Sequence, residues 1–68
     1  PNTSEERKRR LFERVDQHER KEFPTYKVEA QDLIDIANEA INLDMVDVAV
    51  DMLKSAQFVL ERGLPNWV

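Results

Sequence analysis

The chain has 68 residues, of which 41% are hydrophobic and 35% are charged, and its formal net charge is −4. This length holds one domain with a single small core, and this composition is typical of a folded, soluble helical domain rather than a disordered tail. The sequence has no cysteine and one histidine, which excludes disulfides and thiolate metal sites and disfavours a histidine metal cage. Oligomerisation is then the usual remaining way to stabilise so small a domain.

Charge is distributed unevenly along the chain. Residues 1–23 contain seven basic and six acidic residues, a net charge of +1, whereas residues 24–68 contain three basic and eight acidic residues, a net charge of −5. An acidic body attracts cationic partners and repels nucleic acid. No apolar run approaches the ~18 residues of a membrane span, and the charged N-terminus has no signal-peptide pattern. We therefore expect a cytoplasmic protein without membrane contact.

The first predicted helix covers about residues 4–22. The segment TSEE at its start is typical of a capping box, with Thr3 as the N-cap and Glu6 reaching back to a free backbone N–H. Opposite charges four residues apart support the helix, each pair by only ~0.2–0.5 kcal/mol. Its apolar residues are few, namely Leu11, Phe12 and Val15. We expect this helix to dock through a narrow seam and to leave most of its surface in water.

The second predicted helix covers about residues 26–42. Pro24 disfavours helical backbone at the residue before it, and Thr25 offers a side-chain cap to the next helix. Apolar side chains at helical spacing cover about half of the circumference, and polar side chains cover the rest. The predicted apolar face consists of Tyr26, Ala30, Leu33, Ile34, Ala37, Ala40 and Ile41, and the predicted solvent face consists of Asp32, Asp35, Asn38, Glu39 and Asn42.

The third predicted helix covers about residues 45–62 and is followed by a short tail at 64–68. The connection before it is only about two or three residues long, so the second and third helices are expected to be antiparallel neighbours. Asp44 is the expected N-cap of the third helix. Gly63 is the expected glycine of a Schellman motif that ends the helix, with Leu64 packing back on it.

This third helix has the most apolar surface in the chain. At 100° per residue its apolar residues span an arc of roughly 200°, whereas one neighbouring helix covers about half of such an arc. Either the thin seam of the first helix covers the rest, or a second chain does, and we favour the second chain. The residues of the arc are Met45, Val46, Val48, Ala49, Val50, Met52, Leu53, Ala56, Val59 and Leu60.

The predicted fold is therefore all-α, a three-helix arrangement built on an antiparallel hairpin of the second and third helices and completed by dimerisation. Leu53, near the centre of the apolar arc, is expected to face Leu33 in the core. Small residues alternate with large ones over residues 33–60, and this alternation loosely resembles a tetratricopeptide helix hairpin. The sequence has no repeat of the kind that such solenoids need, and the resemblance implies no functional residue.

The sequence contains no pattern that predicts catalysis. Asp32, Asp35 and Glu39 share one helix face, but acid–base carboxylates need a concave, partly buried site, and these three are expected on a solvated face. His18 lacks the glycine-rich elbow that accompanies an activated serine nucleophile. We expect a protein that is not an enzyme, with no catalytic residue, cofactor, metal or small-molecule substrate.

The segment RKRR, residues 7–10, is the strongest candidate for nucleic-acid binding. Four basic residues in one helical turn could contact phosphates. Glutamates at positions 5, 6 and 13 surround this basic turn, however, which favours a salt-bridged surface helix. Docking of the same turn on an acidic protein surface is the other alternative.

The predicted function is that of a small, non-enzymatic protein-interaction module, such as an adaptor, inhibitor or assembly factor, which binds itself and another protein through apolar helix faces. The alternatives are a nucleic-acid-binding regulator that uses the basic turn, and a structural subunit of a larger complex. Phe58 and Trp67 are each either an intrachain contact or an anchor for a partner. The candidate partner-binding residues are Arg7, Arg9, Arg10, Leu11, Phe12, Val15, Val46, Val50, Phe58 and Trp67.

Overall fold

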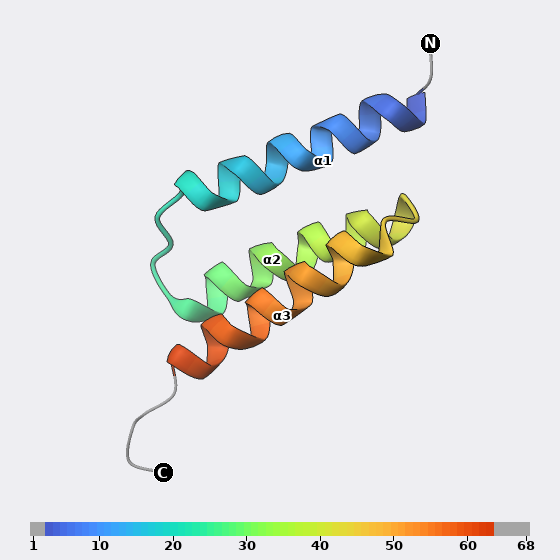
Figure 1. Ribbon diagram of the computed structural model, residues 1–68. Coiled ribbons are helices and arrows are strands. Elements are labelled where there is room, and N and C mark those ends of the chain that lie inside the picture. The colour runs from blue at the N-terminus through green and yellow to red at the C-terminus, as the bar shows by residue number, and fades with distance from the viewer. Residues whose placement is uncertain (1–2, 64–68) are drawn as a thin grey trace.

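The computed structural model describes residues 3–63, which form three α-helices in succession (Figure 1). Helix α1 spans Thr3–Arg20, α2 spans Tyr26–Asn42 and α3 spans Val46–Arg62. The predicted all-α class with three helices is confirmed. The third helix begins one position later than predicted, and the first ends earlier, because the chain leaves the helical path soon after Arg20.

Helices α2 and α3 pack along their length as an antiparallel hairpin, which confirms the predicted pairing, and they lie side by side in Figure 1. Leu33 of α2 and Val59 of α3 fill the contact at the end away from the connecting loop. Buried alanines line the contact, and their small side chains let the two backbones approach closely. These alanines are Ala30, Ala37 and Ala40 on α2 and Ala49 and Ala56 on α3.

Helix α1 packs mainly on α2, and its Leu11 and Val15 belong to a core cluster that also contains Ala49 and Met52 of α3. Leu11, 2% exposed, is the buried residue of α1 and joins Ile36 and Leu43 in one core cluster. The Cα positions extend 22 Å and 11 Å across the long axis, so the three helices form a flattened arrangement rather than a round bundle. Helix α2 is therefore the central helix and is covered on two sides.

The two covered sides of α2 explain where the predicted apolar face was wrong. Ile36 was left out of that face, yet it is fully buried because it points toward α1. Tyr26 and Ile41 were included in it, yet both are about half exposed. A single apolar face describes a helix with one neighbour, whereas α2 has two neighbours at different angles.

The start of α2 follows the prediction. The backbone N–H of Val28 donates a hydrogen bond to Oγ1 of Thr25 at 3.1 Å, and Thr25 has extended backbone geometry as an N-cap residue should. This confirmed cap satisfies one of the free donors in the first turn and fixes where α2 begins after Pro24.

The connection between α2 and α3 differs from the prediction at Asp44. This residue is left-handed, with φ of 60°, which aspartate tolerates better than most residues. Its N–H donates to the carbonyl of Ile41 at 3.0 Å, and the N–H of Met45 donates to the carbonyl of Ala40 at 2.8 Å. These two bonds form a Schellman motif that closes α2. Asp44 therefore ends α2 instead of capping α3, whose N-cap is Met45 without a side-chain cap.

Gly63 has a different role from the one predicted. Its φ is −81°, so it is not the left-handed residue of a Schellman motif. A Cβ atom at this position would lie 2.6 Å from Cδ2 of Tyr26, so glycine is needed because the end of α3 closely approaches the Tyr26 ring. The predicted contact of Leu64 and the tail at 64–68 lie outside the described residues.

Candidate interaction surfaces

One side of α3 exposes a row of apolar side chains, which we call the α3 stripe. It consists of Val46, Val50, Leu53 and Leu60, which are 58%, 41%, 43% and 45% exposed. Spacings of four, three and seven residues bring them to one side of the helix, and the exposed Gln57 fills the gap between the last two. Contiguous apolar surface is more informative than scattered exposed side chains, because it often marks an interaction site.

The α3 stripe lies on the face of the hairpin away from α1. On α3, Ala49 and Ala56 are buried against α2, and Ser55 lines a groove beside α1. At 100° per residue the stripe lies on the opposite side of α3 from Ser55. Ile41, on the opposite side of α2 from Asp32, adds to the same surface. We call this surface the bare face, because no segment within residues 3–63 covers it.

The prediction that Leu53 lies opposite Leu33 in the core is wrong. Leu33 is buried, with 4% of its surface exposed, but Leu53 is 43% exposed and belongs to the α3 stripe. The apolar arc of α3 is wider than one neighbouring helix can cover, and α1 lies on the other side of the hairpin. The centre of the arc therefore falls at the border of the contact with α2.

A row of charged residues borders the α3 stripe. Asp47, Lys54 and Glu61 are seven residues apart, and each follows a stripe residue by one position. All three are exposed, and none forms an ion pair or a side-chain hydrogen bond within residues 3–63. The other edge of the stripe contains Ala49 and Ala56, which are buried against α2. Charge therefore alternates in sign along one edge of the stripe only.

A polar cluster holds α1 on α2. Asp32 accepts a hydrogen bond from the Arg14 guanidinium at 2.7 Å and another from Nδ1 of His18 at 2.7 Å. An ionised carboxylate only accepts hydrogen bonds, so Nδ1 of His18 carries the proton. Burial alone raises the pKa of the Asp32 carboxyl, but the hydrogen bonds from His18 and Arg14 outweigh burial and hold that pKa below its ordinary value. The ring of Phe23 packs 4.9 Å from the His18 ring, centre to centre.

The prediction that Asp32 lies on a solvated face is wrong, because its side chain is 17% exposed and faces α1. Glu39 keeps 42% of its side chain exposed while it forms an ion pair with Arg7 at 3.2 Å. Asp35 and Asn38 are exposed, as predicted. Helix α1 contributes so little apolar surface that it docks on α2 mainly through charged groups.

The basic turn of α1 is largely paired with acidic side chains. Besides the Arg7–Glu39 pair, Arg10 lies 3.3 Å from Glu6, and Arg9 lies 4.0 Å from Glu13. These pairs are exposed, so each contributes about 0–1 kcal/mol. They nevertheless place a carboxylate beside each of three cations that a phosphate backbone would need to contact.

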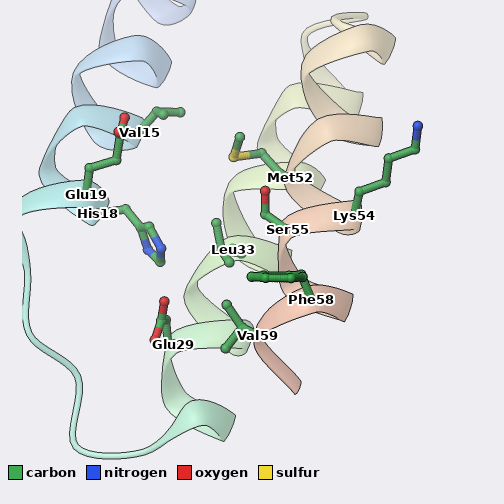
Figure 2. A pocket seen from close by; sticks show the side chains of 10 residues that line it. All are labelled: Val15, His18, Glu19, Glu29, Leu33, Met52, Lys54, Ser55, Phe58 and Val59. Atoms are coloured by element: carbon green, nitrogen blue, oxygen red, sulfur yellow. The ribbon is translucent and has the colours of Figure 1, made fainter. Parts of the chain in front are cut away.

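An open groove of about 510 Å³ runs between α1 and α3 over α2 (Figure 2). Val15 and His18 line it from α1, and Leu33 forms part of its floor. Phe58 stands at its α3 side, 61% exposed, with the Arg62 guanidinium 5.2 Å from the ring centre. The ring of Phe58 therefore borders this groove and is not part of the hairpin core.

The groove does not contain a recognisable catalytic constellation. His18 and Ser55 both line it, and Asp32 orients the imidazole, but no hydrogen bond joins His18 to Ser55. Nucleophile activation requires the base within hydrogen-bond reach of the nucleophile. Within residues 3–63 no group of three His, Cys, Asp or Glu side chains is placed to hold a metal ion.

The structure distributes the predicted partner-binding residues over separate surfaces. Val46 and Val50 lie in the α3 stripe, whereas Phe12 is exposed on α1. Leu11 is part of the core, Val15 lines the groove, and Trp67 lies outside the described residues. The prediction missed three exposed residues of the bare face, Ile41, Leu53 and Leu60. The two that lie on α3 could have been found from the spacing of four and three along that helix and from the width of its apolar arc.

Comparisons with known proteins assign the chain to no family. No family model, no curated protein and no solved structure matches it. In the part of the chain that the structure describes, none of the helices has the length and apolar character needed to cross a membrane. Any functional argument for this protein therefore rests on its own surfaces.

Proposed function

We propose that this protein is a non-enzymatic protein-interaction module whose docking surface is the bare face of the α2–α3 hairpin, and that the bare face binds a second copy of the chain. The observation that carries the proposal is the α3 stripe, four apolar side chains left 41–58% exposed on the side of the hairpin that α1 does not reach. Self-association is the common way for a domain of this size to complete a small core.

The energetic balance supports a weak, reversible dimer. Full burial of an exposed Val or Leu contributes about 1.5–3 kcal/mol. The stripe residues are about half exposed, so the eight of them in a symmetric pair contribute at most on the order of 6–12 kcal/mol. Association costs an estimated ~4–15 kcal/mol in lost freedom. A dissociation constant no tighter than micromolar, equivalent to ~8 kcal/mol, is the expected result.

The bare face also has the charge pattern of an interface centre. Charged residues make up 35% of the chain, yet the residues of the α3 stripe and Ile41 are all uncharged. Gln57, which fills the gap between Leu53 and Leu60 in the stripe, is polar but neutral. Interface centres are depleted in charge and keep it at the rim, which is where Asp47, Lys54 and Glu61 lie.

A pair of matched variants tests this proposal. Val50→Asp places a charge in the stripe, whereas Val28→Asp places the same charge on the far side of α2. The two valines are similarly exposed, Val28 by 45% and Val50 by 41%. Gel filtration with light scattering should give a dimer for the parent chain and for Val28→Asp, and a monomer for Val50→Asp. Circular dichroism checks that both variants remain helical. A parent chain that is monomeric at high concentration, or equal behaviour of the two variants, would contradict the proposal.

A further inference from the structure

We infer that the two copies pair through antiparallel α3 helices in a shifted register, in which Lys54 of each copy lies opposite Asp47 of the other. This inference rests on the proposed self-association and adds its geometry. It is carried by two observations, the spacing of the α3 stripe and the charges along one of its edges that have no partner within residues 3–63.

The spacing of the stripe is that of a helix that packs lengthwise on another helix. Positions 46, 50, 53, 57 and 60 alternate steps of four and three, which is the heptad pattern of a two-helix seam. Four of these positions are apolar and exposed, and the fifth is Gln57. A single polar residue in such a seam restricts which registers are acceptable.

The edge charges indicate the antiparallel direction. A two-fold axis between antiparallel helices brings the same edge of each helix together, so the edge of Asp47, Lys54 and Glu61 meets its own copy. In a parallel pair this edge meets the edge of Ala49 and Ala56, which is already buried against α2. The parallel arrangement therefore leaves the three charges unpaired and requires the α2 helices to be displaced.

The sign of the edge charges then selects the register. If the two stripes overlap over their whole length, Lys54 lies opposite Lys54 of the other copy, and Asp47 lies opposite Glu61 of the other copy. Like charges facing each other across an interface disfavour that register. If one helix is shifted along the other so that the two-fold axis passes between Val50 and Leu53, Lys54 lies opposite Asp47 twice, once on each side of the axis. This register also packs Val50 on Leu53 of the second copy.

A shift in the opposite direction pairs Lys54 with Glu61, and it is less favourable for a separate reason. It moves Val46 and Val50, which are 58% and 41% exposed, out of the overlap, whereas the register centred between Val50 and Leu53 moves out only Leu60. The register centred between Val50 and Leu53 retains Val46 and lies closer to the exposed Ile41. The Lys54–Asp47 register is therefore the more favourable of the two.

Charge reversal and charge exchange test this register in the full chain. Asp47→Lys and Lys54→Asp should each raise the dimer dissociation constant about tenfold, because each turns two attractive contacts into repulsive ones. The exchanged double variant, Asp47→Lys with Lys54→Asp, should return within about twofold of the parent. Asp51→Lys is the matched control, since Asp51 is exposed on the same helix but away from the stripe, and it should leave the constant unchanged.

Sedimentation equilibrium on these variants separates this inference from the proposed function. A parent chain that does not dimerise removes the proposed function. A parent dimer that Val50→Asp dissociates but that neither single reversal affects keeps the function and overturns the register. If Glu61→Lys raises the dimer dissociation constant tenfold and Asp47→Lys leaves it unchanged, the Lys54–Asp47 register is wrong and the opposite shift is favoured. Failure of the double variant to recover also overturns the Lys54–Asp47 register, because a general effect on helix stability explains such a result.

Discussion

Replacing Asp32 with asparagine is expected to lower the free energy of unfolding by about 0.5–2 kcal/mol at neutral pH. Hydrogen bonds to charged groups contribute ~1.5–3 kcal/mol when solvent is excluded. The bond from His18 meets that condition, because its side chain is 10% exposed, whereas Arg14 is 41% exposed and its pair contributes little. The asparagine oxygen keeps one neutral hydrogen bond, worth ~1 kcal/mol, and this reduces the loss.

The effect of this substitution should depend on pH with a definite sign. The pKa of Asp32 is lower in the folded chain than its ordinary value, so the unfolded chain binds more protons near pH 4. The stabilisation is therefore complete above the unfolded pKa of about 4 and is lost as pH falls through the folded pKa. The difference between the parent chain and Asp32→Asn should shrink as pH falls below about 4.

Urea unfolding followed by circular dichroism, at several pH values, measures this difference. Asp35→Asn is the matched control, because Asp35 lies on the same helix and is exposed, and among residues 3–63 its side chain accepts a hydrogen bond only from the Gln31 amide, at 3.1 Å. It should cost less than about 0.5 kcal/mol, as surface substitutions usually do. Equal effects of the two substitutions, or a difference that does not shrink below about pH 4, would refute the role given to Asp32 in docking α1.

Three further predictions concern the core, the end of α3 and the basic turn. Leu33→Ala should lower the free energy of unfolding by about 2–5 kcal/mol, whereas Leu53→Ala should lower it clearly less at protein concentrations where the chain is monomeric. Equal losses of stability in thermal unfolding would contradict the assignment of Leu33 to the core and Leu53 to the surface. Gly63→Ala should lower the melting temperature, because the added Cβ would lie 2.6 Å from the Tyr26 ring; an unchanged or raised value would contradict that close contact. Nucleic-acid duplexes and single strands should bind no tighter than nonspecific levels of ~10⁻⁴–10⁻⁶ M at physiological salt, and submicromolar, salt-sensitive binding in a fluorescence titration would favour a nucleic-acid function.

The helices were predictable because their signals are local. The periodicity of apolar residues, Thr25 as a cap and the short connection after α2 together predict the antiparallel hairpin, and the structure has each of these features. Such signals depend on residues within one or two turns of each other. They do not depend on which other helix lies nearby.

The errors arise where a residue's role is set by distant parts of the chain. Ile36 and Asp32 are buried because α1 covers a second side of α2, and the pattern within α2 does not indicate which side that is. Leu53 is exposed for the complementary reason, because α1 lies away from the α3 stripe. At Asp44 two local preferences competed, N-cap against left-handed closure of the preceding helix, and the Schellman hydrogen bonds prevailed.

The account depends most on the bare face being covered by a second copy of the chain. Sedimentation equilibrium of the parent chain from about 1 µM to about 1 mM spans the dissociation constants expected for the stripe. The account predicts a single monomer–dimer equilibrium, with the average mass rising from about 8.0 kDa toward twice that value. A mass that stays at the monomer value over the whole range would contradict it.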